Sequence, residues 1–275
     1  MNTKKIGTIK CCICQSETVH VSSKTALSDL FECLNCAHVF YAFKPDKKVL
    51  DDLYADEKYY DEGPGIEKKA EYLWERRFYS ISKYIRYFNG NILDVGCGKA
   101  VFLDQAKKQG MSVFGTEYSE YTSKYAIEKY GINPILKDLL SAEFKNNFFD
   151  VVSFWHVLEH LYYPSKYIQE ACRIMKKGGI LIVELPNKDV RGVDIDNQIK
   201  QNQTHLNFFT EKSIKTLLYA NGFRILSCSY KDPRDYAVKI SSKIHHFIEE
   251  KTISAINVLI GRNVGSTIRV IAAKQ

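Results

Sequence analysis

The chain has 275 residues, 45% of them hydrophobic, and a formal net charge of +7 at pH 7. This length allows one sizeable core and a small accessory module. No signal peptide is recognisable and no apolar run approaches the ~18 residues that span a bilayer, so we expect a cytoplasmic protein without a transmembrane segment. Its eight cysteines then indicate metal ligands or free thiols rather than a disulfide framework. The lysines are scattered, so nucleic acid is not expected as a partner.

Two Cys-x-x-Cys pairs lie near the N-terminus, with residues 15–32 between them. This spacing allows two knuckles to converge tetrahedrally on one zinc ion and leaves no open position for chemistry. We therefore predict that residues 1–42 form a zinc ribbon with a structural role. Cys12 is left over, and His38 is an alternative fourth ligand. The four predicted zinc ligands are Cys11, Cys14, Cys33 and Cys36.

The next two segments differ in character. Residues 43–65 contain prolines, glycines and clustered tyrosines, which predicts a linker or lid with little regular structure. From Ile66 to Phe88 the apolar residues follow helical spacing, and Asn89-Gly90 is expected to end that helix.

Residues 91–100 indicate a buried strand that runs into a glycine turn and then a helix. Gly96 and Gly98 allow a tight turn and the close approach of a ligand to the backbone. A second strand follows this helix and ends at Glu117, near the place where doubly wound folds put the carboxylate that holds a ribose. The stretch therefore predicts a nucleoside site.

Strands and helices alternate along the rest of the chain, which predicts a largely parallel sheet with right-handed crossovers. The further predicted strands are 133–136, 149–154, 180–185, 223–229 and 267–273.

The order Asp94-x-Gly96-x-Gly98-x-Ala100 resembles the D-x-G-x-G-x-G signature of class I S-adenosylmethionine-dependent methyltransferases, with Ala100 in place of the third glycine. The resemblance covers residues 91 to about 229 and includes the later motifs in order and spacing. It implies an α/β fold with a Rossmann-like, seven-stranded, mostly parallel sheet, helices on both faces and the last strand inserted antiparallel. It also implies S-adenosylmethionine as cofactor and assigns residues 66–275 to the methyltransferase domain.

The same resemblance implies which residues hold the cofactor. Glu117 would bind the ribose, Asp138 would accept from the adenine amino group, and the helix that begins near Ile66 could reach the methionine carboxylate. Solvent-facing arginines are the alternative for that helix. The implied cofactor-binding residues are Asp94, Gly96, Cys97, Gly98, Glu117, Tyr118, Asp138, Leu139, Trp155, Tyr72 and Arg76.

His156-x-x-Glu159-His160 follows the strand at 149–154. Within a helix this pattern would indicate a zinc protease, but here the first histidine comes directly after a strand, at the sheet edge where ligands bind. A protease would also need a further ligand and would leave the glycine turn unexplained. The segment resembles the part of small-molecule methyltransferases that lines the methyl-transfer site.

Residues 203–210 resemble sugar methyltransferases that carry an N-terminal zinc module. In their pattern a glutamate precedes the histidine that acts as base, and here Thr204 takes that position before His205. The resemblance implies that His205 is catalytic, helped by His156 or His160, and that Tyr60 closes over the acceptor. Histidine suits proton removal near neutral pH, whereas an anionic acceptor would need no base.

Residues 235–262 are predicted to be a helical insertion that packs in the core or forms a surface for a lipid-linked acceptor, a membrane or a second subunit. We therefore predict methyl transfer to a hydroxyl or carbon of a small, sugar-like acceptor, such as a nucleotide sugar or glycan precursor in carbohydrate biosynthesis. The alternatives are an RNA-modifying methyltransferase that uses the ribbon for recognition and a non-catalytic nucleoside-binding adapter.

Overall fold

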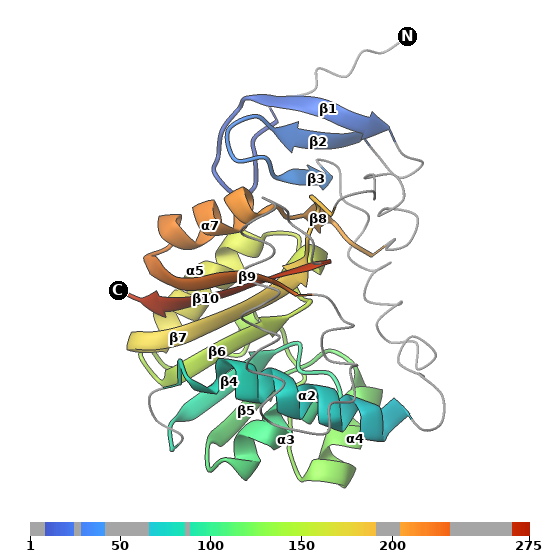
Figure 1. The fold of residues 1–275 in the computed structure, drawn as a ribbon, viewed down its shortest axis with the longest axis vertical. Helices are drawn as coiled ribbons and strands as arrows, with labels where there is room; N and C mark the ends of the chain where they lie inside the picture. Colours follow the sequence, from blue (N-terminus) through green and yellow to red (C-terminus); the bar gives the residue numbers. More distant parts are fainter. Residues whose placement is uncertain (1–8, 25–28, 42–65, 86–88, 191–203, 232–265) are drawn as a thin grey trace, which may run out of the picture.

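The computed structural model describes residues 9–24, 29–41, 66–85, 89–190, 204–231 and 266–275. The predicted lid at 43–65, which includes Tyr60, and the predicted insertion at 235–262 lie outside these residues. Figure 1 shows a central sheet with a small β-module at one end of the molecule.

Six strands form the central sheet in the order β5-β4-β6-β7-β10-β9. The pairs β4–β5, β4–β6 and β6–β7 are parallel, and β10 lies antiparallel between β7 and β9. A parallel bridge between Thr116 and Ile135 continues the sheet beyond β5, at the place predicted for a seventh strand. The strands are β4 (Asn91–Val95), β5 (Ser112–Thr116), β6 (Phe149–Trp155), β7 (Met175–Pro186), β9 (Phe223–Lys231) and β10 (Thr267–Lys274).

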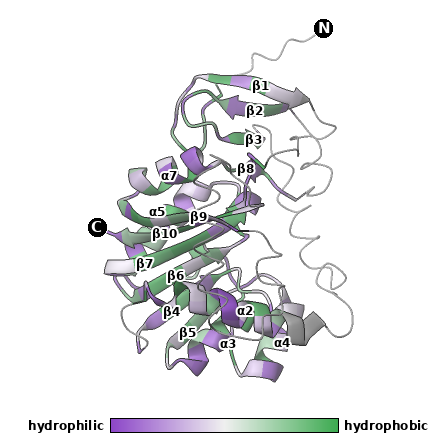
Figure 2. Cartoon of the chain, viewed as in Figure 1, coloured by the Kyte–Doolittle hydropathy of each residue, from purple (hydrophilic) through white to green (hydrophobic). Residues whose placement is uncertain are grey.

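The interior strands form here because their side chains are apolar on both faces, which suits a sheet covered by helices. Four successive residues of β4 and seven of β10 are buried. Figure 2 shows the hydrophobic colour concentrated along β6 and β7 and mixed colours on the helices around them. The covering helices are α2 (Ile66–Ser82), α3 (Val101–Lys108), α4 (Glu120–Tyr130), α5 (Pro164–Ile174) and α7 (Glu211–Ala220).

Local signals set the helix ends. The Ser119 side chain accepts from the Thr122 amide at the start of α4, and Gly131 ends that helix in the left-handed conformation. Pro164 begins α5, and Thr210 with Ser213 forms a capping box on α7. Two short 3₁₀ turns, η2 (Leu139–Ser141) and η3 (Leu158–His160), follow the third and fourth strand positions.

Two predicted elements are shorter than expected. Helix α2 ends at Ser82, before the predicted end near Phe88. Its last turn tightens, because the Tyr84 and Ile85 amides donate to carbonyls three residues earlier and the Ser82 hydroxyl donates to the Tyr79 carbonyl. The strand predicted at 133–136 is reduced to the single bridge at Ile135.

The N-terminal module shares a sheet with a segment of the larger domain. Strands β1 (Val19–Lys24), β2 (Asp29–Cys33) and β3 (Val39–Tyr41) are joined by β8 (Asn207–Phe208), which pairs antiparallel with β3. Leu30, Val39, Tyr41 and Phe208 make a small core there. The strand that follows His205 therefore completes the sheet of the module.

Candidate functional site

The glycine turn between β4 and α3 has the geometry that a ligand needs. Gly96 and Gly98 have φ values of +66° and +53°, and Ala100, at the third glycine position, also adopts the left-handed conformation at +57°. A Cβ atom on Gly98 would meet no atom of the described residues within 4 Å, so the described part of the chain leaves open space in front of this residue. A Cβ atom on Gly96 would lie 3.0 Å from the Val157 side chain. The space at Gly98 fits a cofactor held against the backbone.

Glu117 lies directly beside this turn. Its carboxylate accepts from the amides of Gly98 at 2.7 Å, Tyr118 at 2.7 Å and Ser119 at 2.9 Å. A carboxylate offers about four acceptor positions, so three amides leave room for roughly one ribose hydroxyl. The charge is therefore oriented before any cofactor binds.

Asp94 lies beneath the turn and is buried. The Ser153 hydroxyl donates to its carboxyl group at 2.6 Å. Burial raises the pKa of Asp94 to about 8, with the Ser153 hydrogen bond opposing the rise and the charge of Glu117 adding to it. Cys97, predicted beside the cofactor, is also buried at this turn.

The third strand exit collects polar groups around Asp138. Its carboxylate accepts from the hydroxyl of Tyr118 at 3.0 Å, from the hydroxyl of Tyr167, and from the Leu140 amide at 2.7 Å. Leu139 is buried next to it. Asp138 and Tyr118, both predicted to contact the cofactor, are therefore in direct contact with each other.

Trp155 ends β6 inside an aromatic cluster. Its ring packs edge-on against Trp74 and Phe102, with centroid distances of 5.2 and 5.0 Å. The indole nitrogen is buried and has no hydrogen-bond partner among the described residues. An indole N–H usually has a partner when it is buried, so this donor is available to a bound ligand.

Helix α2 carries the two remaining predicted cofactor residues. Arg76 donates to the Tyr72 hydroxyl at 3.0 Å, and Tyr72 is exposed. The next residue, Arg77, points inward, with its guanidinium 4.5 Å from the Trp74 ring and 3.2 Å from Glu184.

Glu184 and Arg269 form a buried ion pair that we did not predict. Their side chains are 1% and 2% exposed, and the Glu184 carboxylate accepts from the Arg269 guanidinium at 2.6 and 2.5 Å. A glutamate within the apolar strand at 180–185 was the one sequence signal for this pair. The pair joins β7 to β10 and supports the first histidine of the H-x-x-E-H segment.

That histidine, His156, has the left-handed φ of +56° directly after β6. Its two ring nitrogens lie 3.3 Å from Glu159 and 3.5 Å from Glu184. Burial opposes a charge on the ring, but the close carboxylates of Glu159 and Glu184 outweigh it and raise the pKa of His156 to about 9. His156 is therefore a cation at neutral pH.

His205 and His160 are brought together from segments distant in the chain. Their ring centroids are 4.8 Å apart and the rings are nearly perpendicular. The Leu206 amide donates to the Glu159 carbonyl at 2.8 Å, which ties the two segments. Burial lowers the pKa of His205 to about 4, so its ring is neutral at pH 7. Glu159, which the sequence offers only as part of the H-x-x-E-H motif, is a buried carboxylate close to both rings.

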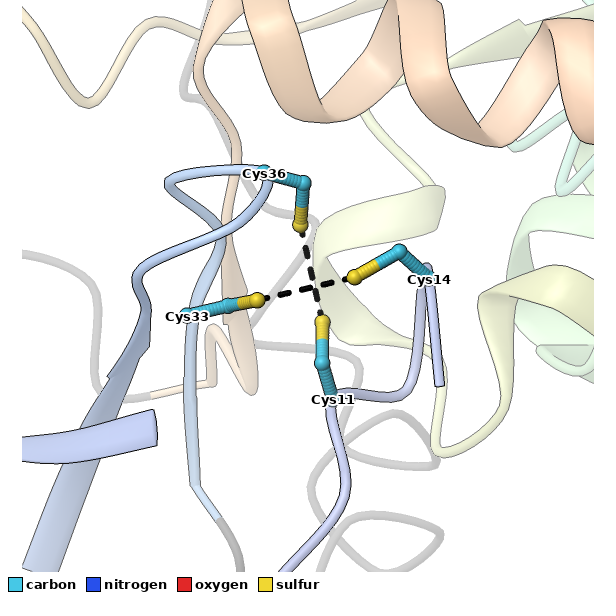
Figure 3. Close-up of side chains that lie close together, drawn as sticks. All are labelled: Cys11, Cys14, Cys33 and Cys36. Atoms are coloured by element: carbon cyan, nitrogen blue, oxygen red, sulfur yellow. Dashed lines mark hydrogen bonds between the residues drawn. The ribbon is translucent and has the colours of Figure 1, made fainter. Parts of the chain in front are cut away.

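The four predicted zinc ligands converge on one point (Figure 3). Sulfur–sulfur distances are 3.6 Å for Cys11–Cys36 and 3.5 Å for Cys14–Cys33. A tetrahedral site with Zn–S bonds of ~2.3 Å has edges of about 3.8 Å, so the cysteines fit a zinc ion. His38, the alternative ligand, is not a member of this cluster. Its Nε2 lies 3.2 Å from Asn207 Oδ1 and its ring packs on Phe209.

No helix in the described part of the chain is both long enough and apolar enough to cross a membrane.

Comparisons with known proteins agree with this geometry. A family model described as a methyltransferase domain matches residues 71–228, more than half of the chain. A probable S-adenosylmethionine-dependent methyltransferase of Mycolicibacterium smegmatis is 25% identical over 165 residues, which are 59% of this chain and 63% of that protein. A mitochondrial ubiquinone biosynthesis O-methyltransferase of Candida albicans is 31% identical over 107 residues, which are 36% of this chain and 33% of that protein. The chain thus spans less than two thirds of the length of both.

The fold is also found among solved structures. Phosphoethanolamine N-methyltransferase 2 of Haemonchus contortus, in complex with S-adenosyl-L-methionine, has a TM-score of 0.58 and 17% identity, covering 86% of this chain and 61% of that one. With the family match, these findings show that the chain belongs to the methyltransferase-domain family and has the fold of solved S-adenosylmethionine-dependent methyltransferases.

Proposed function

We propose that this enzyme methylates a hydroxyl or carbon of a small, sugar-like acceptor, such as a nucleotide sugar or glycan precursor, at the C-terminal edge of the central sheet. The proposal is supported chiefly by one observation: a buried, neutral His205 lies against His160. His160 follows β6, the neighbour of strand β4 that ends at the glycine turn. The similarity to the ubiquinone biosynthesis O-methyltransferase of Candida albicans favours oxygen as the accepting atom. The sugar-like character rests on the resemblance of residues 203–210.

S-adenosylmethionine, when bound, supplies an electrophilic methyl group for in-line displacement. The chain's own part is to hold the acceptor in line and to remove its proton where it has one. Gly98, Glu117 and Asp138 are the residues proposed to hold the cofactor.

The two kinds of histidine have different parts in this reaction. His156 is doubly protonated at neutral pH, so it can donate a hydrogen bond but cannot act as a base. His205 has its lone pair available, and Glu159 stabilises the imidazolium that forms after proton transfer. We therefore propose His205 as the group that accepts the proton, with His160 as its neighbour. Tyr60 stays a proposed acceptor contact from the segment before the domain.

The test begins with S-adenosylhomocysteine release against a panel of nucleotide sugars, other small metabolites and RNA. With an acceptor in hand, His205→Ala should lower the single-turnover rate by about 10²- to 10⁴-fold, the usual contribution of a general base. His20→Ala on the exposed face of β1 is the matched control and should leave the rate unchanged. Near-wild-type transfer by His205→Ala and His160→Ala at saturating acceptor would overturn histidine base catalysis and favour an anionic acceptor.

We also propose that the N-terminal cysteines hold one zinc ion with a structural role. The closed set of four thiols supports this, because it leaves no ligand position open for chemistry.

A further inference from the structure

We propose that Glu159, His160 and His205 bind one divalent transition-metal ion at the acceptor side of the methyl-transfer site. This site is separate from the four cysteines. Its catalytic role rests on the proposed methyl transfer to a small acceptor and replaces His205 as the base in that reaction, whereas ion binding itself does not depend on the proposed function.

The first observation is the state of Glu159. Its side chain is 1% exposed, and neither carboxylate oxygen has a hydrogen-bond partner among the described residues. A buried carboxylate is costly unless it is paired, hydrogen-bonded or bound to a metal. One oxygen lies 3.3 Å from His156 Nδ1, which neutralises part of the charge but leaves the second oxygen without a hydrogen bond. A bound metal ion would supply the partner that this carboxylate lacks.

The second observation is the arrangement of the two histidines. Potential ligand atoms of Glu159, His160 and His205 all lie within 4.8 Å of one another. Three ligand atoms about 2.1 Å from one ion lie about 3.0–3.6 Å from one another, so these separations would have to shorten by roughly an ångström to close the site. Binding of an ion therefore requires the three side chains to turn toward one another.

The third observation is how the ligands are oriented. His160 Nδ1 donates a hydrogen bond to the Thr204 carbonyl at 3.2 Å, and this contact directs Nε2 toward Glu159, at 3.9 Å. A carbonyl partner on the distal nitrogen is the usual support of a metal-bound histidine. The Leu206 amide bonded to the Glu159 carbonyl and the Asn207 amide bonded to the Leu161 carbonyl hold the two ligand segments together.

Two imidazoles and one carboxylate leave coordination positions open, unlike the four cysteines. The set suits Zn²⁺, Mn²⁺, Fe²⁺ or Co²⁺. A hydroxyl that bound at an open position would lose its proton to solvent more readily, because the positive charge stabilises the alkoxide. In that state the lone pair of His205 is engaged, and acidification of the hydroxyl takes the place of proton transfer to His205. The inference therefore narrows the acceptor to oxygen nucleophiles.

The test is a titration of the full chain with Mn²⁺, followed by the electron paramagnetic resonance signal of free Mn²⁺, with no cofactor or acceptor present. Mn²⁺ prefers oxygen and nitrogen ligands, so the cysteine site does not compete for it. We expect one Mn²⁺ per chain, and at least a tenfold higher dissociation constant for Glu159→Gln and for His205→Gln. His20→Ala is the control and should bind as wild type. His156→Gln, which removes the ion-pair partner of Glu159 without removing a ligand, should bind as tightly as wild type or more tightly.

Thermal unfolding of each variant shows whether weaker Mn²⁺ binding comes from the removed ligand or from an unfolded protein. Absence of Mn²⁺ binding to the wild type would overturn the proposal, and so would equal binding by folded Glu159→Gln and His205→Gln. Weakened binding by His156→Gln would place the ion elsewhere and overturn the assignment of these ligands. A chain that binds no Mn²⁺ but still releases S-adenosylhomocysteine with an acceptor would refute the ion site while leaving the proposed function intact.

Discussion

The buried pair of Glu184 and Arg269 allows a quantitative prediction. Glu184→Gln keeps the shape of the side chain and removes its charge, so no cavity forms. Arg269, at 2% exposure, then keeps a buried positive charge without its carboxylate, and Arg77 loses the partner that lies 3.2 Å away. Breaking one partner of a buried ion pair costs about 3–5 kcal/mol. We therefore expect the free energy of unfolding of Glu184→Gln to be lower than that of the wild type by this amount.

The measurement is urea unfolding of wild type and variant, with Glu128→Gln as the control. Glu128 pairs with Lys124 at 3.9 Å, and both side chains are mostly exposed, so its loss should cost less than about 1 kcal/mol. The pH dependence provides a second check. Burial opposes ionisation of Glu184, but Arg269, His156 and Arg77 together hold its pKa well below its usual value.

Because that pKa is depressed, the stabilisation is complete above the unfolded value of about 4.5 and is lost as the pH falls below it. The unfolding free energies of wild type and Glu184→Gln should therefore converge in acid. A loss below about 1 kcal/mol at pH 7, or a difference that does not shrink in acid, would show that Arg269 finds other compensation and would refute this reasoning.

Three further outcomes are expected. Glu117→Gln should weaken S-adenosylmethionine binding by about 1–3 kcal/mol in calorimetry, because it removes the charged acceptor beside Gly98; an unchanged affinity would contradict the assignment of the ribose site. Because the pKa of Asp94 is raised in the folded state, the free energy of unfolding should fall as the pH rises from about 4 to about 8 and stay level above that range. Asp94→Asn should flatten this part of the stability–pH curve. An unchanged curve would contradict the raised pKa. Metal analysis should find one zinc per chain bound to the cysteines, and Cys33→Ser with Cys36→Ser should abolish it; full retention in the double variant would rule out the ribbon.

The sequence by itself was sufficient for the local features of this protein. The strand, glycine turn and helix at 91–108 were predictable because an apolar run and two glycines act within about ten residues. The convergence of the cysteines followed from matched short spacings, which confine each pair to one knuckle. Capping residues such as Thr210 marked helix ends for the same local reason. The class of fold followed from the order of these elements.

Contacts between distant segments depended on the tertiary structure. Arg269 comes 85 residues after Glu184, and only the antiparallel pairing of β10 with β7 brings their charges together in a dry interior. The place of His205 against His160 depends on β8 adding to the N-terminal module, a pairing of two-residue length that leaves no periodic pattern. The protonation of His156 and His205 likewise follows from burial and from which carboxylates surround each ring, and these are properties of packing and not of spacing along the chain.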